Sequence, residues 1–111
     1  MRPEQVPRPG PDDLDDEALR TRIRLRRALV DEGDYFALLG VAHQATGYDI
    51  RRSYLELRRQ FSPGQVLRPS TVDLQEDIDT ILEVLDEAYD ILRDERRRER
   101  YRRAIESIPA G

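Results

Sequence analysis

The sequence predicts an all-α fold whose centre is an antiparallel pair of long helices. Residues 49–61 and 73–93 both repeat apolar side chains at the spacing of an amphipathic helix. Between them stands Ser62-Pro63-Gly64, where proline disfavours an α conformation in the residue before it and glycine eases a turn. No segment alternates polar and apolar residues as a β-strand does. We therefore expect a helical hairpin with this Ser-Pro-Gly turn at its tip.

The composition argues against several classes of function. The 111 residues suffice for one modest hydrophobic core. With no cysteine and a single histidine, His43, which we expect at the surface, the chain suggests no enzyme, cofactor or metal site. No apolar run approaches the ~18 residues of a membrane span, so we expect a cytoplasmic protein. A net charge of −4 disfavours nucleic acid as the main partner, although it does not exclude a local basic patch.

The first third of the chain contains a tail and an additional helix. Residues 1–11 are polar and rich in proline, which predicts a flexible tail. Asp12 or Asp13 can cap a helix and Gly33 can end it, so residues 12–33 are expected to form an extra N-terminal helix packed on the domain. Its predicted apolar line consists of Leu14, Ala18, Leu25 and Leu29, with Leu19, Ile23 and Val30 beside it.

Two local signals lead into the hairpin. Asp34 and Gly40 are placed to begin and end a short helix over residues 35–39, because a left-handed helix terminus favours glycine. Thr46 and Asp49 have the spacing of a capping box, in which each side chain accepts a backbone N–H. The helix that follows has an apolar stripe of Ile50, Tyr54, Leu57 and Phe61. Its opposite side and flank carry Arg51, Arg52, Leu55, Arg58 and Arg59, which we call the basic face.

The second long helix has the widest apolar stripe in the chain. Asp73 and Glu76 have the spacing to cap its start. Its apolar residues cover about half of the helix circumference, so the helix must pack against more than one neighbour. Asp94 can cap a last helix over residues 95–107, where Glu95, Glu99 and Glu106 stand three or four residues from several arginines, the spacing of internal ion pairs. Four tyrosines fall on core stripes: Tyr35, Tyr54, Tyr89 and Tyr101.

Four short motifs, in the same order, resemble one known family. Asp34-Tyr35-Phe36-Ala37-Leu38-Leu39-Gly40-Val41 resembles the opening of a J domain, the module of DnaJ-type co-chaperones. Ala45-Thr46, followed by Ile50-Arg51-Arg52-Ser53-Tyr54 and Leu57, resembles the family's second helix. Glu87-Ala88-Tyr89-Asp90-Ile91-Leu92-Arg93-Asp94 is similar to the end of its third helix, and Arg97-Arg98 with Tyr101 to its fourth. The resemblance implies a J-like domain over residues 34–108.

The chain departs from the family at the turn. The family's signature there is His-Pro-Asp, which engages a DnaK-type chaperone and couples docking to ATP hydrolysis. Here only Pro63 matches, because Ser62 replaces the ring nitrogens of histidine and Gly64 replaces a carboxylate. The resemblance therefore implies a divergent co-chaperone or adaptor that does not stimulate a DnaK-type ATPase.

These observations define a candidate partner-binding site and its alternatives. The candidate residues are those of the basic face and the turn: Arg51, Arg52, Leu55, Arg58, Arg59, Ser62, Pro63 and Gly64. The partner is either a DnaK-type chaperone or a replacement protein. The alternative for the arginines is a solvated face that complements the acids of the long helix, and for the turn a simple corner. The alternative functions are a structural interaction module of a larger assembly and, more weakly, phosphate-backbone binding by the arginine-rich last helix. The oligomeric state is not indicated.

Overall fold

A computed structural model describes residues 11–108 of the chain, with side-chain surroundings from residue 15 onward. The predicted proline-rich tail therefore lies outside the described residues, apart from Pro11, which is the first residue of a helix. The elements in order are α1 (Pro11–Glu32), α2 (Tyr35–Leu39), α3 (Gly47–Gln60), α4 (Pro63–Val66), the 3₁₀ helix η1 (Pro69–Leu74), α5 (Gln75–Leu92) and α6 (Glu95–Glu106). No strand occurs in this part of the chain, and the all-α prediction is confirmed.

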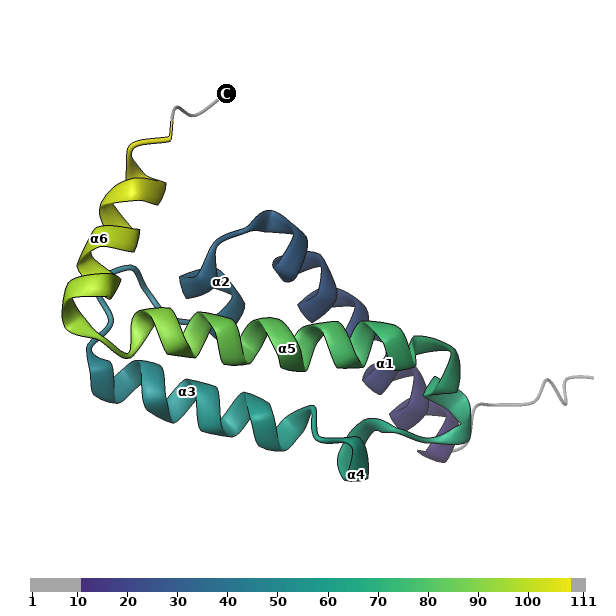
Figure 1. Ribbon diagram of the computed structural model, residues 1–111. Coiled ribbons are helices and arrows are strands. Elements are labelled where there is room, and N and C mark those ends of the chain that lie inside the picture. Colours follow the sequence, from purple (N-terminus) through teal and green to yellow (C-terminus); the bar gives the residue numbers. More distant parts are fainter. Residues whose placement is uncertain (1–10, 109–111) are drawn as a thin grey trace, which may run out of the picture.

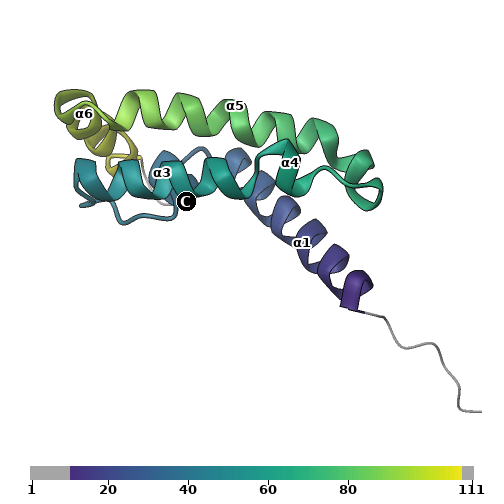
Figure 2. The ribbon, with the colours of Figure 1, turned by 90° about the horizontal axis from the view of Figure 1, so that it is seen from below.

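The antiparallel hairpin of α3 and α5 forms the body of the molecule (Figure 1). Helix α1 crosses the hairpin at an angle (Figure 2), and α6 turns away from the opposite end of the hairpin (Figure 1). Helix α5 contacts α1, α2, α3, η1 and α6, so its wide apolar stripe meets several neighbours, as expected. The core consists of Leu19, Ile23, Phe36, Leu38, Leu39, Ile50, Leu57, Phe61, Val66, Leu74, Ile78, Ile81, Leu85, Ala88 and Leu92.

Three helices begin at the capping residues that the sequence indicates. The carboxylate of Asp34 accepts the backbone N–H groups of Phe36 and Ala37 at the start of α2. The capping box of Thr46 and Asp49 is complete at the start of α3. Asp94 accepts the N–H of Arg97 at the start of α6. These bonds satisfy N–H groups that a helix leaves without intrahelical partners.

The predicted tyrosines pack against the core but stay partly exposed. Tyr54 of α3 stacks on Tyr89 of α5, with ring centroids 4.1 Å apart. Tyr101 of α6 stacks on Tyr35 at 4.8 Å, accepts the Tyr35 N–H, and donates its hydroxyl hydrogen to the carbonyl of Gly33. This second pair is the main aromatic attachment of α6, a helix in which no residue is fully buried.

The apolar residues predicted for the extra N-terminal helix are only partly right: Leu29 and Val30 pack against the core, but Ala18 and Leu25 are exposed. Leu25, placed on the predicted apolar line, is 63% exposed, whereas Leu19 and Ile23 are buried at 4% and 0%. The side chain of Leu14 lies outside the described part of the chain. The error arose because α1 has two adjacent apolar lines, and only its angle across α5 decides which of them is buried.

The start of the long helix also differs from the prediction. Helix α5 begins at Gln75, preceded by η1, and its N-cap residue Leu74 makes no side-chain capping bond. Asp73 does not cap the helix, because Arg20 of α1 binds its two carboxylate oxygens at 2.7 and 3.1 Å. A tertiary ion pair has therefore replaced the local capping interaction.

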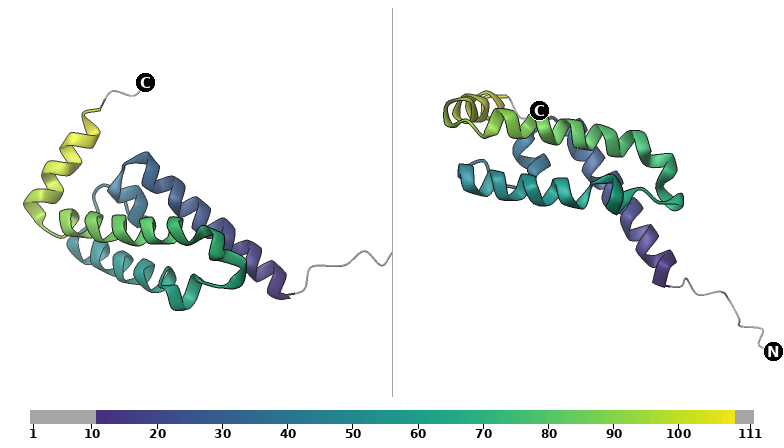
Figure 3. Two further views of the ribbon diagram at one scale, coloured as in Figure 1. Left: turned by 45° about the vertical axis from the view of Figure 1, so that its right-hand side comes forward. Right: turned by 60° about the horizontal axis from the view of Figure 1, so that its bottom comes forward.

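The Ser-Pro-Gly turn ends α3 as predicted, but it does not form the tip of the hairpin. Ser62 is the N-cap residue of α4, and Pro63 is the first residue of that short helix. Residues 67–74 then form the end of the hairpin beside α1, while α4 projects from its side (Figure 3). The expected tip position therefore belongs to η1 and the loop before it.

Candidate protein-interaction site

The basic face lies on the exposed surface of α3. Arg51, Arg52, Leu55 and Arg59 are all exposed, and Leu55 keeps 52% of its surface accessible. Arg52, Leu55 and Arg59 line one shallow hollow together with Glu56. An apolar side chain between guanidinium groups provides both a hydrophobic contact and hydrogen-bond donors, a combination suited to a protein surface.

Two arginines of the basic face are paired within the chain. Arg59 binds Glu56 with contacts of 2.5 and 3.2 Å. Bonds from Arg59 and Gln60 lower the pKa of the Glu56 carboxyl to about 2. Arg58 is half-buried, with its Nε 3.5 Å from Asp86 of α5. Arg51 and Arg52 have no ion-pair partner among the described side chains, so they are the cations most available to a partner.

The Ser-Pro-Gly turn contributes few polar groups to this surface. The Ser62 hydroxyl donates to the Arg59 carbonyl at 2.9 Å, which closes the end of α3. Pro63 and Gly64 are exposed at the start of α4. Gly64 does not need the special freedom of glycine, because its φ is not positive and a Cβ there would meet no atom within 4 Å. Neither an acidic side chain nor an aromatic ring is present at the turn.

The loop after the turn is fixed to α1. The buried hydroxyl of Thr71 donates to the Val66 carbonyl at 2.5 Å and accepts the Arg68 N–H at 3.0 Å. Arg20 of α1 donates to the Ser70 carbonyl at 2.6 Å in addition to its pair with Asp73. The extra helix thus holds the segment that follows the turn, a connection that sequence reasoning did not find.

The family of the chain follows from comparison with known proteins. The family model described as the DnaJ domain matches residues 34–102, from the cap of α2 to the arginines of α6. The chain belongs to the DnaJ domain family. The resemblance found in the sequence is confirmed. Helix α1 lies outside the residues that the family model covers.

Full-length DnaJ proteins are among the relatives of this J domain. The chain is 35% identical over 72 residues to the chaperone protein DnaJ of Exiguobacterium sibiricum, covering 65% of the chain and 18% of the relative. It is 37% identical over 70 residues to that of Paramagnetospirillum magneticum, covering 63% and 17%. It is 35% identical over 68 residues to "DnaJ homolog l(2)tid, mitochondrial" of Drosophila melanogaster, covering 61% and 12%.

These matches are restricted to one region of each relative. The chain spans less than a fifth of the length of these curated relatives. No solved structure matches the chain significantly. The comparisons therefore describe a J domain, a module of co-chaperones, and not the rest of the relatives.

Sequence reasoning missed the setting of His43, which was expected to be an ordinary surface residue. Its ring lies against Phe36, with centroids 4.9 Å apart, and its two nitrogens are each 3.0 Å from a carboxylate, of Asp34 and Glu106. The hydrogen bond with Asp34, followed by that with Glu106, raises the pKa of His43. The histidine thus bridges the loop before α3 and the end of α6, residues 63 positions apart in sequence. No local pattern could have indicated that contact.

The described part of the J domain contains neither a metal-binding cluster nor a helix that could cross a membrane. No group of three histidine, aspartate or glutamate side chains comes close enough there to hold a metal ion. None of its helices combines the length and the apolar character that crossing a membrane requires.

Proposed function

We propose that this J domain is a non-catalytic interaction module, a divergent co-chaperone or adaptor of the cytoplasm that binds a protein partner without stimulating a DnaK-type ATPase. The partner is a DnaK-type chaperone or a protein that has replaced it. The proposed contact surface is the basic face with the Ser-Pro-Gly turn. Arg51, Arg52 and Leu55 are exposed on it, and neither of these arginines has an ion-pair partner in the described chain.

One observation carries this proposal. The turn presents a hydroxyl that is bonded to its own helix end and a glycine without a side chain. The family's His-Pro-Asp signature would instead place an imidazole and a carboxylate there, and a carboxylate binds an arginine fork through charge-assisted bonds. A serine hydroxyl cannot replace both groups. Docking and the stimulation of hydrolysis are therefore separable in this chain.

The ATPase activity of a purified DnaK-type chaperone under single-turnover conditions tests the proposal. The unmodified protein is expected to leave the rate of hydrolysis unchanged. Any clear acceleration by the unmodified protein would refute the proposed loss of function.

Restoring the signature tests whether the surface still docks. In the double variant Ser62→His with Gly64→Asp, the new aspartate fits because the space beside Gly64 is open. We expect no stimulation even then, since Leu55 and Glu56 replace basic residues of the family's face and Glu56 neutralises Arg59. The matched control is Ser62→Ala with Gly64→Ala. Stimulation by the restored variant but not by the control would show that the basic face still binds the chaperone.

The exposure of Leu55 favours a second candidate function, a structural interaction module in an assembly without a chaperone. An apolar side chain with 52% exposure among arginines fits a hydrophobic pocket on another protein. A pull-down from native extract, repeated with Leu55→Arg, discriminates the two functions. A partner lost in Leu55→Arg and unrelated to DnaK-type chaperones would favour this second function.

A further inference from the structure

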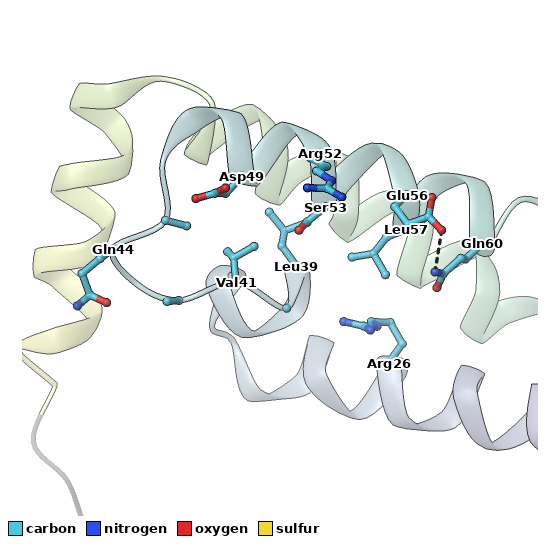
Figure 4. A pocket seen from close by; sticks show the side chains of 13 residues that line it. Arg26, Leu39, Val41, Gln44, Asp49, Arg52, Ser53, Glu56, Leu57 and Gln60 are labelled. Carbon is cyan, nitrogen blue, oxygen red and sulfur yellow. Dashed lines mark hydrogen bonds between the residues drawn. The ribbon is translucent and has the colours of Figure 1, made fainter.

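A second surface of the molecule is an open groove between α1 and α3, with a volume of about 700 Å³ (Figure 4). Arg26 extends from α1 toward α3, and Leu57 faces it from the other side. Leu39 and Val41 line the groove beside them, at the end of α2 and the start of the next loop. A groove of this volume can accommodate two or three side chains of a peptide.

Arg26 is a partly buried cation of the groove whose hydrogen bonding is incomplete. One of its terminal nitrogens donates to the Leu38 carbonyl at 2.5 Å, an acceptor at the C-terminal end of α2. No carboxylate of the described side chains lies within ion-pair distance of its guanidinium, which has five N–H donors. Burial lowers the pKa of Arg26, because the charge is partly removed from water without an anionic partner.

The other charged side chains of the groove differ in whether they have a partner within the chain. Arg52 lies at the α3 edge and likewise has no ion-pair partner in the described chain. The two acids at the edge are already bonded, since Asp49 accepts the Thr46 N–H of the capping box and Glu56 binds Arg59 and Gln60. The groove therefore has two cations without an ion-pair partner in the described chain, against one acid that is paired with Arg59 and one, Asp49, that is held only by a backbone N–H.

We propose that the groove binds a short acidic peptide segment of a protein partner, with a carboxylate between Arg26 and Arg52 and a neighbouring aliphatic side chain on Leu39, Val41 and Leu57. A carboxylate provides the acceptor that the partly buried guanidinium lacks, and charge-assisted bonds of this kind are the stronger ones. The aliphatic side chain covers the apolar floor. Arg26 belongs to α1, outside the residues of the family match, so this site depends on the extra helix.

Selection from a random peptide display library tests the proposal directly. The intact chain is the target, and binders that also recognise Ala42→Glu are removed, because that exposed residue lines the groove and its substitution adds a repelling carboxylate. The remaining peptides are expected to contain aspartate or glutamate next to leucine, isoleucine or valine. Ala28→Glu, an exposed position on α1 outside the groove lining, is the control for the added charge.

The most enriched peptide is then synthesised and its affinity measured for point variants. Arg26→Gln is expected to weaken binding about tenfold, the loss of one charge-assisted contact. Arg22→Gln removes the same charge from an exposed position one turn away and should have no effect. Circular dichroism of Arg26→Gln checks the fold, and Arg26→Lys, which keeps the charge, should recover part of the affinity.

Changes in amide NMR chemical shifts on addition of the peptide show where it binds. Shifts at Leu39, Val41 and Leu57 support the proposal. The proposal is overturned if the shift changes are confined to Arg51 and Leu55. It is also overturned if the selected peptides are rich in basic residues, or if the library yields no binder that is sensitive to Ala42→Glu. The ATPase result at the Ser-Pro-Gly turn does not affect this outcome.

Discussion

His43 connects two segments that are distant in the sequence. The charge state of its ring determines how strongly the two segments are held together. The carboxylates of Asp34 and Glu106 face its two nitrogens, and Arg102 of α6 lies 3.8 Å from the same Glu106. Because both groups that face the ring nitrogens are anionic, the imidazolium form is favoured in the folded protein, and the pKa of His43 is raised from 6.5. The cationic ring is therefore part of the attachment of α6.

We expect the stability of the folded protein to fall as the pH rises through the neutral range. A group whose pKa is higher when folded contributes fully below its unfolded value of 6.5 and loses that contribution as the pH passes its folded pKa. Urea unfolding midpoints measured from about pH 6 to about pH 8 should decline, and His43→Gln should flatten the decline. If the midpoints of the unmodified protein and of His43→Gln decline equally with pH, the bridge from His43 to Asp34 and Glu106 is not formed in solution.

The stacked pair of Tyr54 and Tyr89 predicts a contrast between neighbouring positions. Tyr89→Ala should lower the free energy of unfolding by roughly 2–3 kcal/mol, because it removes a stacked and half-buried ring. Asp90→Ala should change it by less than about 0.5 kcal/mol, since Asp90 is exposed and its contact with Arg97 is long, 3.4 Å. Chemical denaturation measures both values. Similar losses would contradict the orientation of α5.

At the scale of an element, α1 offers the clearest test of packing. Ile23→Ala should cost about 2–4 kcal/mol, because the side chain is fully buried against the core. Leu25→Ala should be nearly neutral, since Leu25 is 63% exposed on the same helix. Thermal unfolding of the two variants tests this orientation, because an apolar line that included Leu25 would make both substitutions destabilising.

The elements that could be predicted are those whose evidence is local. Asp34, Thr46 and Asp94 bond backbone groups two or three residues away, so the sequence alone indicates where α2, α3 and α6 begin. Asp73 has the same kind of spacing, but Arg20, 53 positions away, binds it instead. Local patterns do not contain such distant partners.

The candidate site was predictable only in part, for the same reason. The exposure of the basic face follows from helical periodicity, and Arg51, Arg52, Leu55 and Arg59 are exposed. The pairing of Arg58 with Asp86 depends on how α3 and α5 are aligned. The position of the Ser-Pro-Gly turn short of the hairpin end depends on the length and packing of the loop after it.

At the scale of the whole molecule, the distribution of charge disfavours nucleic acid as a partner. Arg97 of α6 contacts Asp90, and Arg102 and Arg103 contact Glu99. The net charge of the chain is −4. We therefore expect duplex binding to be weaker than about micromolar at physiological salt and to disappear as salt is added. Fluorescence anisotropy with a labelled duplex measures this, and a tighter, salt-resistant complex would contradict the proposed module.

The attachment of residues 67–74 to α1 has a consequence for hydrogen exchange. Because Arg20 bonds both Ser70 and Asp73, the loop cannot open widely while α1 remains in place. Opening of the loop and undocking of the helix should therefore be one event, with one free energy. Amides protected inside the loop, such as that of Thr71, should therefore exchange at a rate set by the undocking of α1. Arg20→Ala should accelerate their exchange while leaving the amides in the middle of α5 slow.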